Sequence, residues 1–187
     1  MKGTTVYAAK TGVEVVGVTR RRTKGEFVEK YGAVRMRFFQ MEGDKNSIRV
    51  ILNPVEAAKL GRVLKKLTSS QKAAKVQIFY HSYEKDGKKI STTLTAEKWV
   101  KGEKSGYALV LHQKNGGEVK INVPMDKDTA YYLGLLMEHL AVEQSWFAVS
   151  KEDTEETEET PSSPSPDGSV EEVDDLEEVD DVDDIDF

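Results

Sequence analysis

The sequence predicts an α+β fold: two tandem units, each of four antiparallel strands and one helix (ββββα), form a pseudo-twofold domain with packed helices. A disordered acidic C-terminal tail is expected to follow. Three observations lead to this prediction: an internal repeat, a strand-like alternation that gives way to helical spacing in each repeat, and an abrupt change of charge near residue 150. We expect the first unit at residues 1–70, the second at 71–149 and the tail at 150–187.

The internal repeat relates residues 34–67 to residues 107–140, at an offset of seventy-three positions and without a gap. Eight of these thirty-four positions are identical: Gln40/Gln113, Gly43/Gly116, Ile48/Ile121, Val50/Val123, Ala57/Ala130, Leu60/Leu133, Gly61/Gly134 and Leu67/Leu140. Self-similarity at a fixed period indicates duplicated structural units. One such unit would have a thin core by itself, so we expect the two copies to pack on each other.

In the first unit, β-branched residues predict strands at 4–10 and 13–19, followed by a basic loop at 20–25. Residues 34–39 alternate apolar and basic side chains, which is typical of a strand with one buried and one exposed face. A turn at 42–46 leads to a returning strand at 47–52. Asn53 and Pro54 then predict a helix start, because Asn is a favoured N-cap and Pro fits the first helical position.

The second unit repeats this plan, with strands predicted at 76–83, 88–95, 107–112 and 118–123. Residues 96–106 are expected to form a basic connection between the second and third of these strands. Asp126 is the predicted N-cap of a helix that runs to about Gln144. Tyr7 and Tyr80 align at the same offset, and we expect both in the core.

Charge divides the chain sharply. From Lys151 onward one lysine stands against eighteen acidic residues, a net charge of −17, whereas residues 1–150 carry a net charge of +11. A basic domain indicates a polyanionic partner, and a block of like charge indicates an interaction tail. The alternative is a solubilising tail on a domain whose surface is basic without a ligand.

Several protein classes are excluded by composition. The chain has no cysteine and only three scattered histidines, so we expect no disulfide, no structural zinc and no cofactor. No catalytic constellation appears within the domain, which indicates that the protein is not an enzyme. No apolar run is long enough to cross a membrane and no signal peptide opens the sequence, so we expect a cytoplasmic, nucleoid-associated protein.

The tandem ββββα units resemble the Whirly single-stranded-DNA-binding proteins and, as a fused dimer, the positive-cofactor-four transcriptional coactivators. The tail ends in Asp183, Asp184, Ile185, Asp186 and Phe187, and it resembles the acidic C-termini of single-strand-binding proteins, which often end in Phe. Both resemblances imply single-stranded DNA as the ligand. The tail resemblance implies that these last residues bind replication or repair proteins.

Binding a single strand requires cations for phosphates and flat side chains for bases. The predicted contacts are basic, aromatic or amide side chains on exposed strand positions and in the two basic connections. They are Arg20, Arg21, Arg22, Lys24, Arg35, Arg37, Phe39, Arg49, Lys98, Trp99, Lys101, Lys120 and Asn122. A tryptophan is more often buried in a core than turned towards a ligand, so Trp99 has both interpretations. The first unit is the more basic one and is expected to bind more strongly.

The predicted function is largely sequence-independent binding of single-stranded DNA in replication, recombination or repair. Three alternatives stay open: a transcription factor or coactivator that binds melted promoter DNA, an RNA-binding protein, and an acidic-tailed scaffold that binds proteins. The oligomeric state is open between a monomer and a homo-oligomer.

Overall fold

The structure is a computed structural model, and it describes residues 3–41, 47–85 and 87–151. The predicted tail contacts, Asp183 to Phe187, lie outside these residues. The elements in chain order are β1 (Gly3–Tyr7), β2 (Thr11–Lys24), β3 (Phe27–Gln40), β4 (Ser47–Leu52), α1 (Pro54–Ser69), β5 (Ala74–Lys85), β6 (Lys88–Lys101), β7 (Lys104–Lys114), β8 (Glu118–Met125), α2 (Lys127–Glu143) and β9 (Phe147–Lys151).

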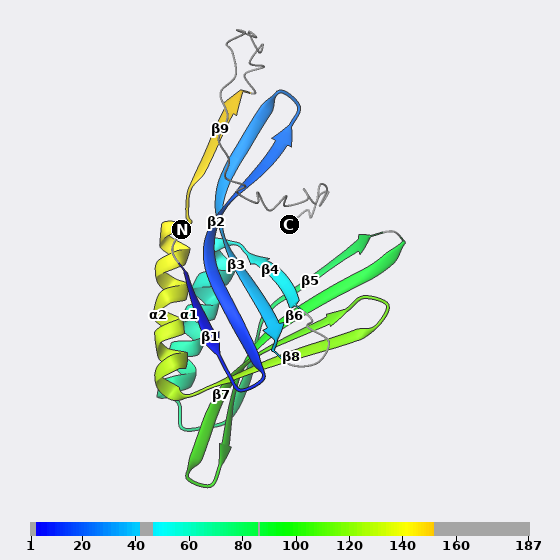
Figure 1. Cartoon of the computed structure of the whole chain (residues 1–187). Coiled ribbons are helices and arrows are strands. Elements are labelled where there is room, and N and C mark those ends of the chain that lie inside the picture. The colour runs from blue at the N-terminus through cyan, green and yellow to red at the C-terminus, as the bar shows by residue number, and fades with distance from the viewer. Residues whose placement is uncertain (1–2, 42–46, 86, 152–187) are drawn as a thin grey trace, which may run out of the picture. The chain divides into compact units, whose positions relative to one another are not determined.

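Two antiparallel sheets and two helices make up the described residues (Figure 1). Sheet A has the strand order β1-β2-β3-β4, with β9 also paired to β3, and sheet B has the order β5-β6-β7-β8. Each set of four consecutive strands is followed by a helix, and both helices lie on the same side of the sheets in Figure 1. The predicted fold class, α+β with two ββββα units, is confirmed.

The alternation in the strands decides which side chains enter the core. On β3, Val34, Met36 and Phe38 are fully buried, while Arg35 and Arg37 between them face the other way. The helices contribute Leu60 and Leu64 from α1 and their counterparts from α2 to the same apolar cluster, which includes residues of both sheets. We call the sheet surface turned away from this cluster the outer face.

Both helices begin as the sequence predicts. The Asn53 side chain accepts a hydrogen bond from the Glu56 backbone at 2.8 Å, and the Glu56 carboxylate accepts one from the Asn53 backbone at 3.1 Å, which completes a capping box. Asp126 caps α2 by accepting from the Thr129 N–H at 2.7 Å. That hydrogen bond lowers the pKa of Asp126, because it stabilises the charged carboxylate.

The helices cross where the two repeats bring equivalent glycines together. A Cβ added to Gly61 would lie 2.7 Å from the Gly134 carbonyl oxygen, so the two backbones are in contact at this point. Lys65 donates to Glu138 at 2.7 Å, and these two residues are also seventy-three positions apart. Contacts between equivalent residues are expected of a twofold interface, here within one chain.

Two predicted connections are strands instead. Residues 20–24, predicted as a loop, continue β2 and pair with β3 from Phe27 to Tyr31. Residues 96–101 continue β6 and pair with β7 from Lys104. Residues 20–24 are polar on both faces, so they lack the apolar alternation that marks a half-buried strand. In residues 96–101 the alternation is broken by Lys98, which is buried on the same face as Ala96.

Candidate nucleic-acid interface

The outer face of sheet A gathers the basic and aromatic residues of the first predicted hairpin. Arg35, Arg37 and Phe39 alternate along β3 with the buried side chains, so they share one face. Arg49 on β4 lies directly opposite Arg37, and Ser47 lies opposite Phe39. Like charges in directly opposite positions destabilise a sheet unless something offsets them, so this pair marks a surface suited to a polyanion.

One acid lies among these arginines. Glu14 on β2 is 3.8 Å from the guanidinium groups of both Arg35 and Arg37, at the edge of ion-pair distance. Its carboxylate is half-buried and lies in register with Arg37. A single carboxylate shared by two cations leaves the face positively charged. Glu14 therefore holds the guanidinium groups in place without neutralising them.

The aromatic part of this face is a pair of rings. Phe39 lies opposite Gly12, and a Cβ on Gly12 would lie 2.8 Å from Cε2 of the Phe39 ring and closer still to Cζ, so the ring rests on the glycine backbone. Tyr7 meets Phe39 edge to face, with ring centroids 6.0 Å apart. The Arg37 guanidinium lies 5.5 Å from the Phe39 ring centroid. Flat rings beside cations are the components of a single-strand binding groove.

Tyr7 and Tyr80 are exposed, so the prediction that both lie in the core is wrong. Tyr7 is 69% exposed and Tyr80 is 54% exposed. Tyr7 follows the buried Val6 on β1, so its side chain lies on the outer face. The alternation of Thr5, Val6 and Tyr7 is consistent with this placement, because neighbouring strand residues lie on opposite faces.

Sheet B has a corresponding row of outer-face residues, but the residue types differ from those in sheet A. Tyr80, Thr93, His112 and Lys120 lie opposite one another across its four strands, as Tyr7, Gly12, Phe39 and Ser47 do in sheet A. His112 is paired with Glu118 at 2.6 Å. Asn122, also on β8, is exposed on this face, and its backbone oxygen accepts a hydrogen bond from Thr11 of sheet A at 2.7 Å.

The second basic segment is divided between the two faces. Trp99 is 49% exposed and, with the exposed Lys101, lies on the outer face of sheet B. Lys98 is only 7% exposed, and its ammonium group donates to the carbonyl oxygens of Leu67 and Ser70 at the end of α1. The prediction that Lys98 contacts nucleic acid is therefore wrong. Its charge stabilises the C-terminal end of a helix instead.

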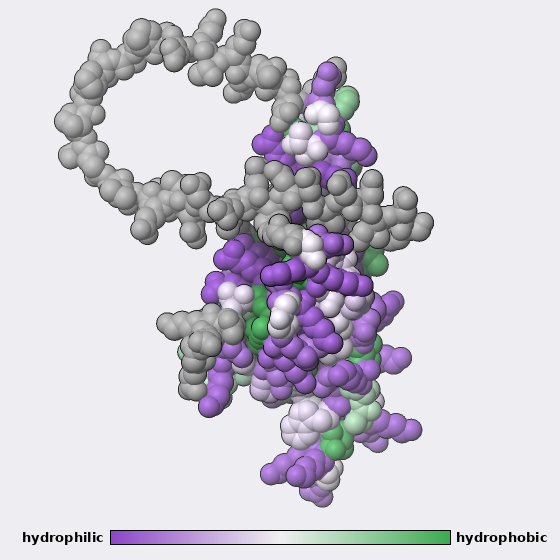
Figure 2. Space-filling model, turned by 90° about the vertical axis from the view of Figure 1, so that its right-hand side faces the viewer, coloured by the Kyte–Doolittle hydropathy of each residue, from purple (hydrophilic) through white to green (hydrophobic). Residues whose placement is uncertain are grey.

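The first basic segment is also divided by its strand pairing. Arg20, Arg22 and Lys24 lie on the same side of β2 as Glu14, whereas Arg21 lies on the opposite side. Arg20 is in register with Tyr31, and Arg22 with Glu29, on the neighbouring β3. These cations continue the outer face of sheet A along the extended hairpin. Figure 2 views the side away from the helices, where hydrophilic side chains (purple) dominate and paler ones lie among them.

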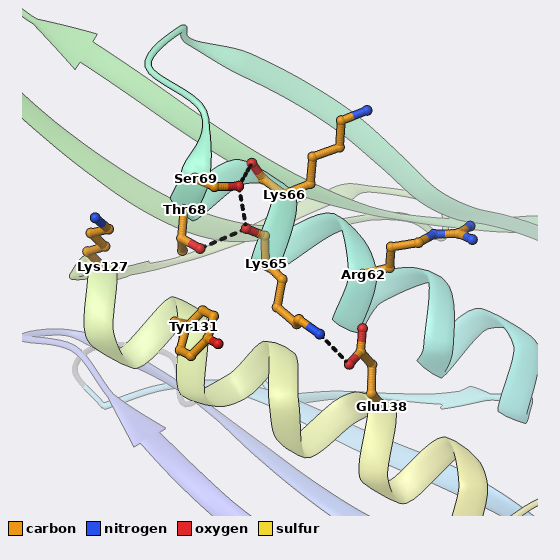
Figure 3. Close-up of a pocket in the computed structure, with 8 residues that line it drawn as sticks. All are labelled: Arg62, Lys65, Lys66, Thr68, Ser69, Lys127, Tyr131 and Glu138. Carbon is orange, nitrogen blue, oxygen red and sulfur yellow. Dashed lines mark hydrogen bonds and ion pairs between the residues drawn. The ribbon is translucent and has the colours of Figure 1, made fainter.

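A hollow of about 550 Å³ lies between the helices, away from the outer faces (Figure 3). Its lining residues are Arg62, Lys65, Lys66, Thr68, Ser69, Lys127, Tyr131 and Glu138. Lys65 is neutralised by Glu138, and that hydrogen bond raises the pKa of Lys65. The Thr68 and Ser69 hydroxyls donate to carbonyl oxygens of α1. The hollow offers one ring, Tyr131, among these groups, whereas the sheets combine several exposed rings with cations, so we place the candidate interface on the sheets.

Residues 3–41, 47–85 and 87–151 contain no cluster of three or more metal-ligating side chains. Neither of the helices in those ranges is long and apolar enough to cross a membrane.

No protein-family model matches the sequence, and no curated protein matches it either. Three solved plant structures share its fold, and all are Whirly proteins. WHY1 of Arabidopsis thaliana aligns with a TM-score of 0.56 at 16% identity, over 77% of this chain and 85% of its own. WHY3 of Arabidopsis thaliana gives 0.55 at 15%, over 77% and 88%. The plant transcriptional regulator PBF-2 gives 0.54 at 16%, over 76% and 81%. The predicted Whirly-like fold is confirmed.

Proposed function

We propose that this protein binds single-stranded DNA with little sequence preference, through the outer faces of its two sheets. The observation that carries the proposal is the outer face of sheet A, where the Tyr7–Phe39 ring pair lies beside Arg37 and Arg49. Rings stack on bases of any identity, and arginines contact phosphates that every nucleotide carries. Neither kind of contact reads sequence.

The shape of the face favours a single strand over a duplex. Phe39 rests on the glycine backbone of β2, and an exposed ring can stack only on a base that is itself unstacked from its neighbours. Bases in a duplex are already stacked and paired, so they would have to be extruded first. The resemblance to Whirly proteins supports the same ligand.

The acidic tail gives the protein a second role in this proposal. Its net charge of −17 opposes the +11 of residues 1–150, so it competes with DNA for the basic outer faces. Its last residues, Asp183, Asp184, Ile185, Asp186 and Phe187, then recruit replication or repair proteins once DNA displaces the tail. The protein would act in the cytoplasm, at the nucleoid, as a binding protein rather than an enzyme.

The test is fluorescence anisotropy of labelled poly-dT, duplex DNA and RNA, titrated with the full chain at two salt concentrations. We expect tight binding to poly-dT, weaker binding to duplex, and a loss of affinity at the higher salt. Preference for RNA would redirect the proposal to an RNA-binding protein. Absence of salt-sensitive binding to all three probes would overturn it in favour of a protein-binding scaffold.

A role in transcription is the second candidate, favoured by the likeness to the fold of a plant transcriptional regulator. The same outer faces would then grip melted promoter DNA. A strong preference for one sequence in a panel of single strands would support this candidate, because sheet rings and arginines alone do not produce it.

A further inference from the structure

The β6–β7 hairpin carries a tryptophan lying on a glycine. Trp99 and Gly106 are directly opposite each other in the two strands. A Cβ added to Gly106 would lie 2.6 Å from the indole Nε1 and closer still to the ring carbons, so the ring occupies the space of the missing side chain. The indole therefore rests on the backbone of β7, as Phe39 rests on Gly12 in sheet A.

This position against Gly106 leaves part of the Trp99 indole accessible to a ligand. Trp99 is 49% exposed although its ring lies against Gly106, so about half of the side chain is accessible to a ligand. A large aromatic ring that is held against a strand and is half exposed to solvent can serve as a stacking platform. A side chain at position 106 would tilt the ring away from the strand.

Two cations extend the same surface towards the hairpin tip. Lys101 and Lys104 are exposed, lie directly opposite each other, and share the outer face with Trp99 and Gly106. Opposite like charges are unfavourable for the sheet by themselves. They suit a ligand whose phosphates pass over the hairpin end while a base reaches the indole.

We infer that Trp99, seated on Gly106, is a second nucleobase-stacking site, separate from the Tyr7–Phe39 pair, and that Gly106 is its positioning residue. The inference rests on the proposed function and deepens it. The ligand is an unstacked base of a single strand whose backbone is held by Lys101 and Lys104. One protein chain therefore binds a single strand of nucleic acid through aromatic stacking sites on both sheets.

The experiment uses the full chain with Trp146→Phe, so that Trp99 is its one tryptophan. Poly-dT is titrated while indole fluorescence and anisotropy are recorded. We expect quenching of Trp99 at saturation, and a roughly tenfold weaker affinity when Trp99→Ala is added, since stacking of one base accounts for about that factor. Trp99→Phe should restore most of the affinity.

Gly106→Ala tests the seat itself. Alanine suits a strand better than glycine does, and the displaced ring can move into solvent, so we expect an unchanged or higher Tm. Affinity for poly-dT should nevertheless fall, by at least about threefold, because the new methyl group displaces the ring from its place on the strand. In the Trp99→Ala background the same change should have no further effect on affinity.

Gly117→Ala is the matched control, because a Cβ there meets nothing within 4 Å. It should leave affinity and quenching unchanged. Unaltered affinity in both Trp99→Ala and Gly106→Ala, with no quenching in the parent, would overturn the inference while the parent still binds poly-dT. Should Gly106→Ala fail to fold, Trp99→Ala and Trp99→Phe decide the question. A parent chain that binds no nucleic acid would overturn the proposed function as well.

Discussion

Gly61 and Gly134 hold the same place in the two repeats, and they meet backbone to backbone where α1 crosses α2. Lys65 and Glu138 make the same kind of pair one turn further along each helix, through a 2.7 Å hydrogen bond between side chains. An ancestral homodimer with identical halves would have brought like residues together at this axis. The present chain places a lysine opposite a glutamate there, which two identical halves could not do.

Gly61→Ala should destabilise the protein. The added methyl meets the Gly134 carbonyl oxygen and the Glu138 nitrogen, at 2.7 and 2.9 Å, and backbone atoms cannot turn aside. Overpacking of this kind costs about 1–3 kcal/mol, from which a helical alanine recovers about 1 kcal/mol. Urea denaturation checks this. A Cβ on Gly134 would lie 3.0 Å from Lys65 Cγ and 3.1 Å from the Gly61 carbonyl oxygen, which is looser than the contacts at Gly61, so we expect a smaller loss. Equal losses for both changes would contradict the argument.

Arg37→Gln and Arg49→Gln should each weaken poly-dT binding by roughly tenfold at low salt, the usual scale for a hydrogen bond to a charged group. Each should also reduce the slope of log affinity against log salt by about 0.7, the value for one phosphate contact on a single strand. Anisotropy titrations across a salt series measure both. Arg62→Gln on the exposed side of α1 is the control and should change neither quantity.

Tyr7→Ala and Tyr80→Ala should each reduce affinity for poly-dT by about five- to tenfold through lost stacking. Tyr132 is a matched control, since it is 52% exposed against 54% for Tyr80 but lies on α2. Its change to alanine should leave binding intact. Isothermal titration calorimetry with poly-dT separates the three variants. A loss of affinity in Tyr132→Ala as large as in Tyr80→Ala would place the ligand elsewhere.

A chain that ends at Lys151 should bind poly-dT more tightly than the full chain, and the gain should shrink as salt is raised. Removal of residues 152–187 takes away all eighteen tail acids, so DNA no longer competes with them for the outer faces. The end point keeps β9 whole. Anisotropy at low and high salt compares the two chains, and equal affinity at low salt would show that the tail does not compete.

The Lys65–Glu138 pair predicts a loss of stability at high pH. The hydrogen bond to Glu138 raises the pKa of Lys65 above its ordinary 10.5. The folded state therefore holds this proton more tightly than the unfolded chain, so the contribution is fully present below pH 10.5 and is lost as pH rises through the folded-state pKa. The Tm difference between the parent and Glu138→Gln should narrow above that pH. A difference that stays constant from neutral to alkaline pH would contradict this.

Much of the fold follows from local signals in the sequence. The capping residues Asn53 and Asp126 and the apolar stripes behind them locate both helices, because caps and helical spacing are short-range features. The repeat extends that success from one unit to the other. The alternation of Val34 to Phe39 likewise separates the buried residues from the arginines.

The features that could not be predicted from the sequence depend on contacts between residues far apart in the chain. Lys98 reads as an exposed cation, yet its ammonium group meets the end of a helix about thirty positions earlier, an encounter that only the folded chain creates. The Arg20–Lys24 strand is stabilised by pairing with β3 rather than by its own composition. The seats of Phe39 and Trp99 depend on glycines that strand register places opposite them, and register is not visible in a single strand.

The pairing of β9 with β3 has a consequence for how the protein is made. Residues Phe147 to Lys151 pair with Tyr31 to Phe27. The β3 strand therefore leaves the ribosome more than a hundred positions before its partner β9 is synthesised. During synthesis the first repeat emerges with this edge of its sheet open. The domain therefore becomes complete only when nearly all of it has left the exit tunnel, and a nascent chain halted after α2 would carry an unpaired strand edge open to other chains.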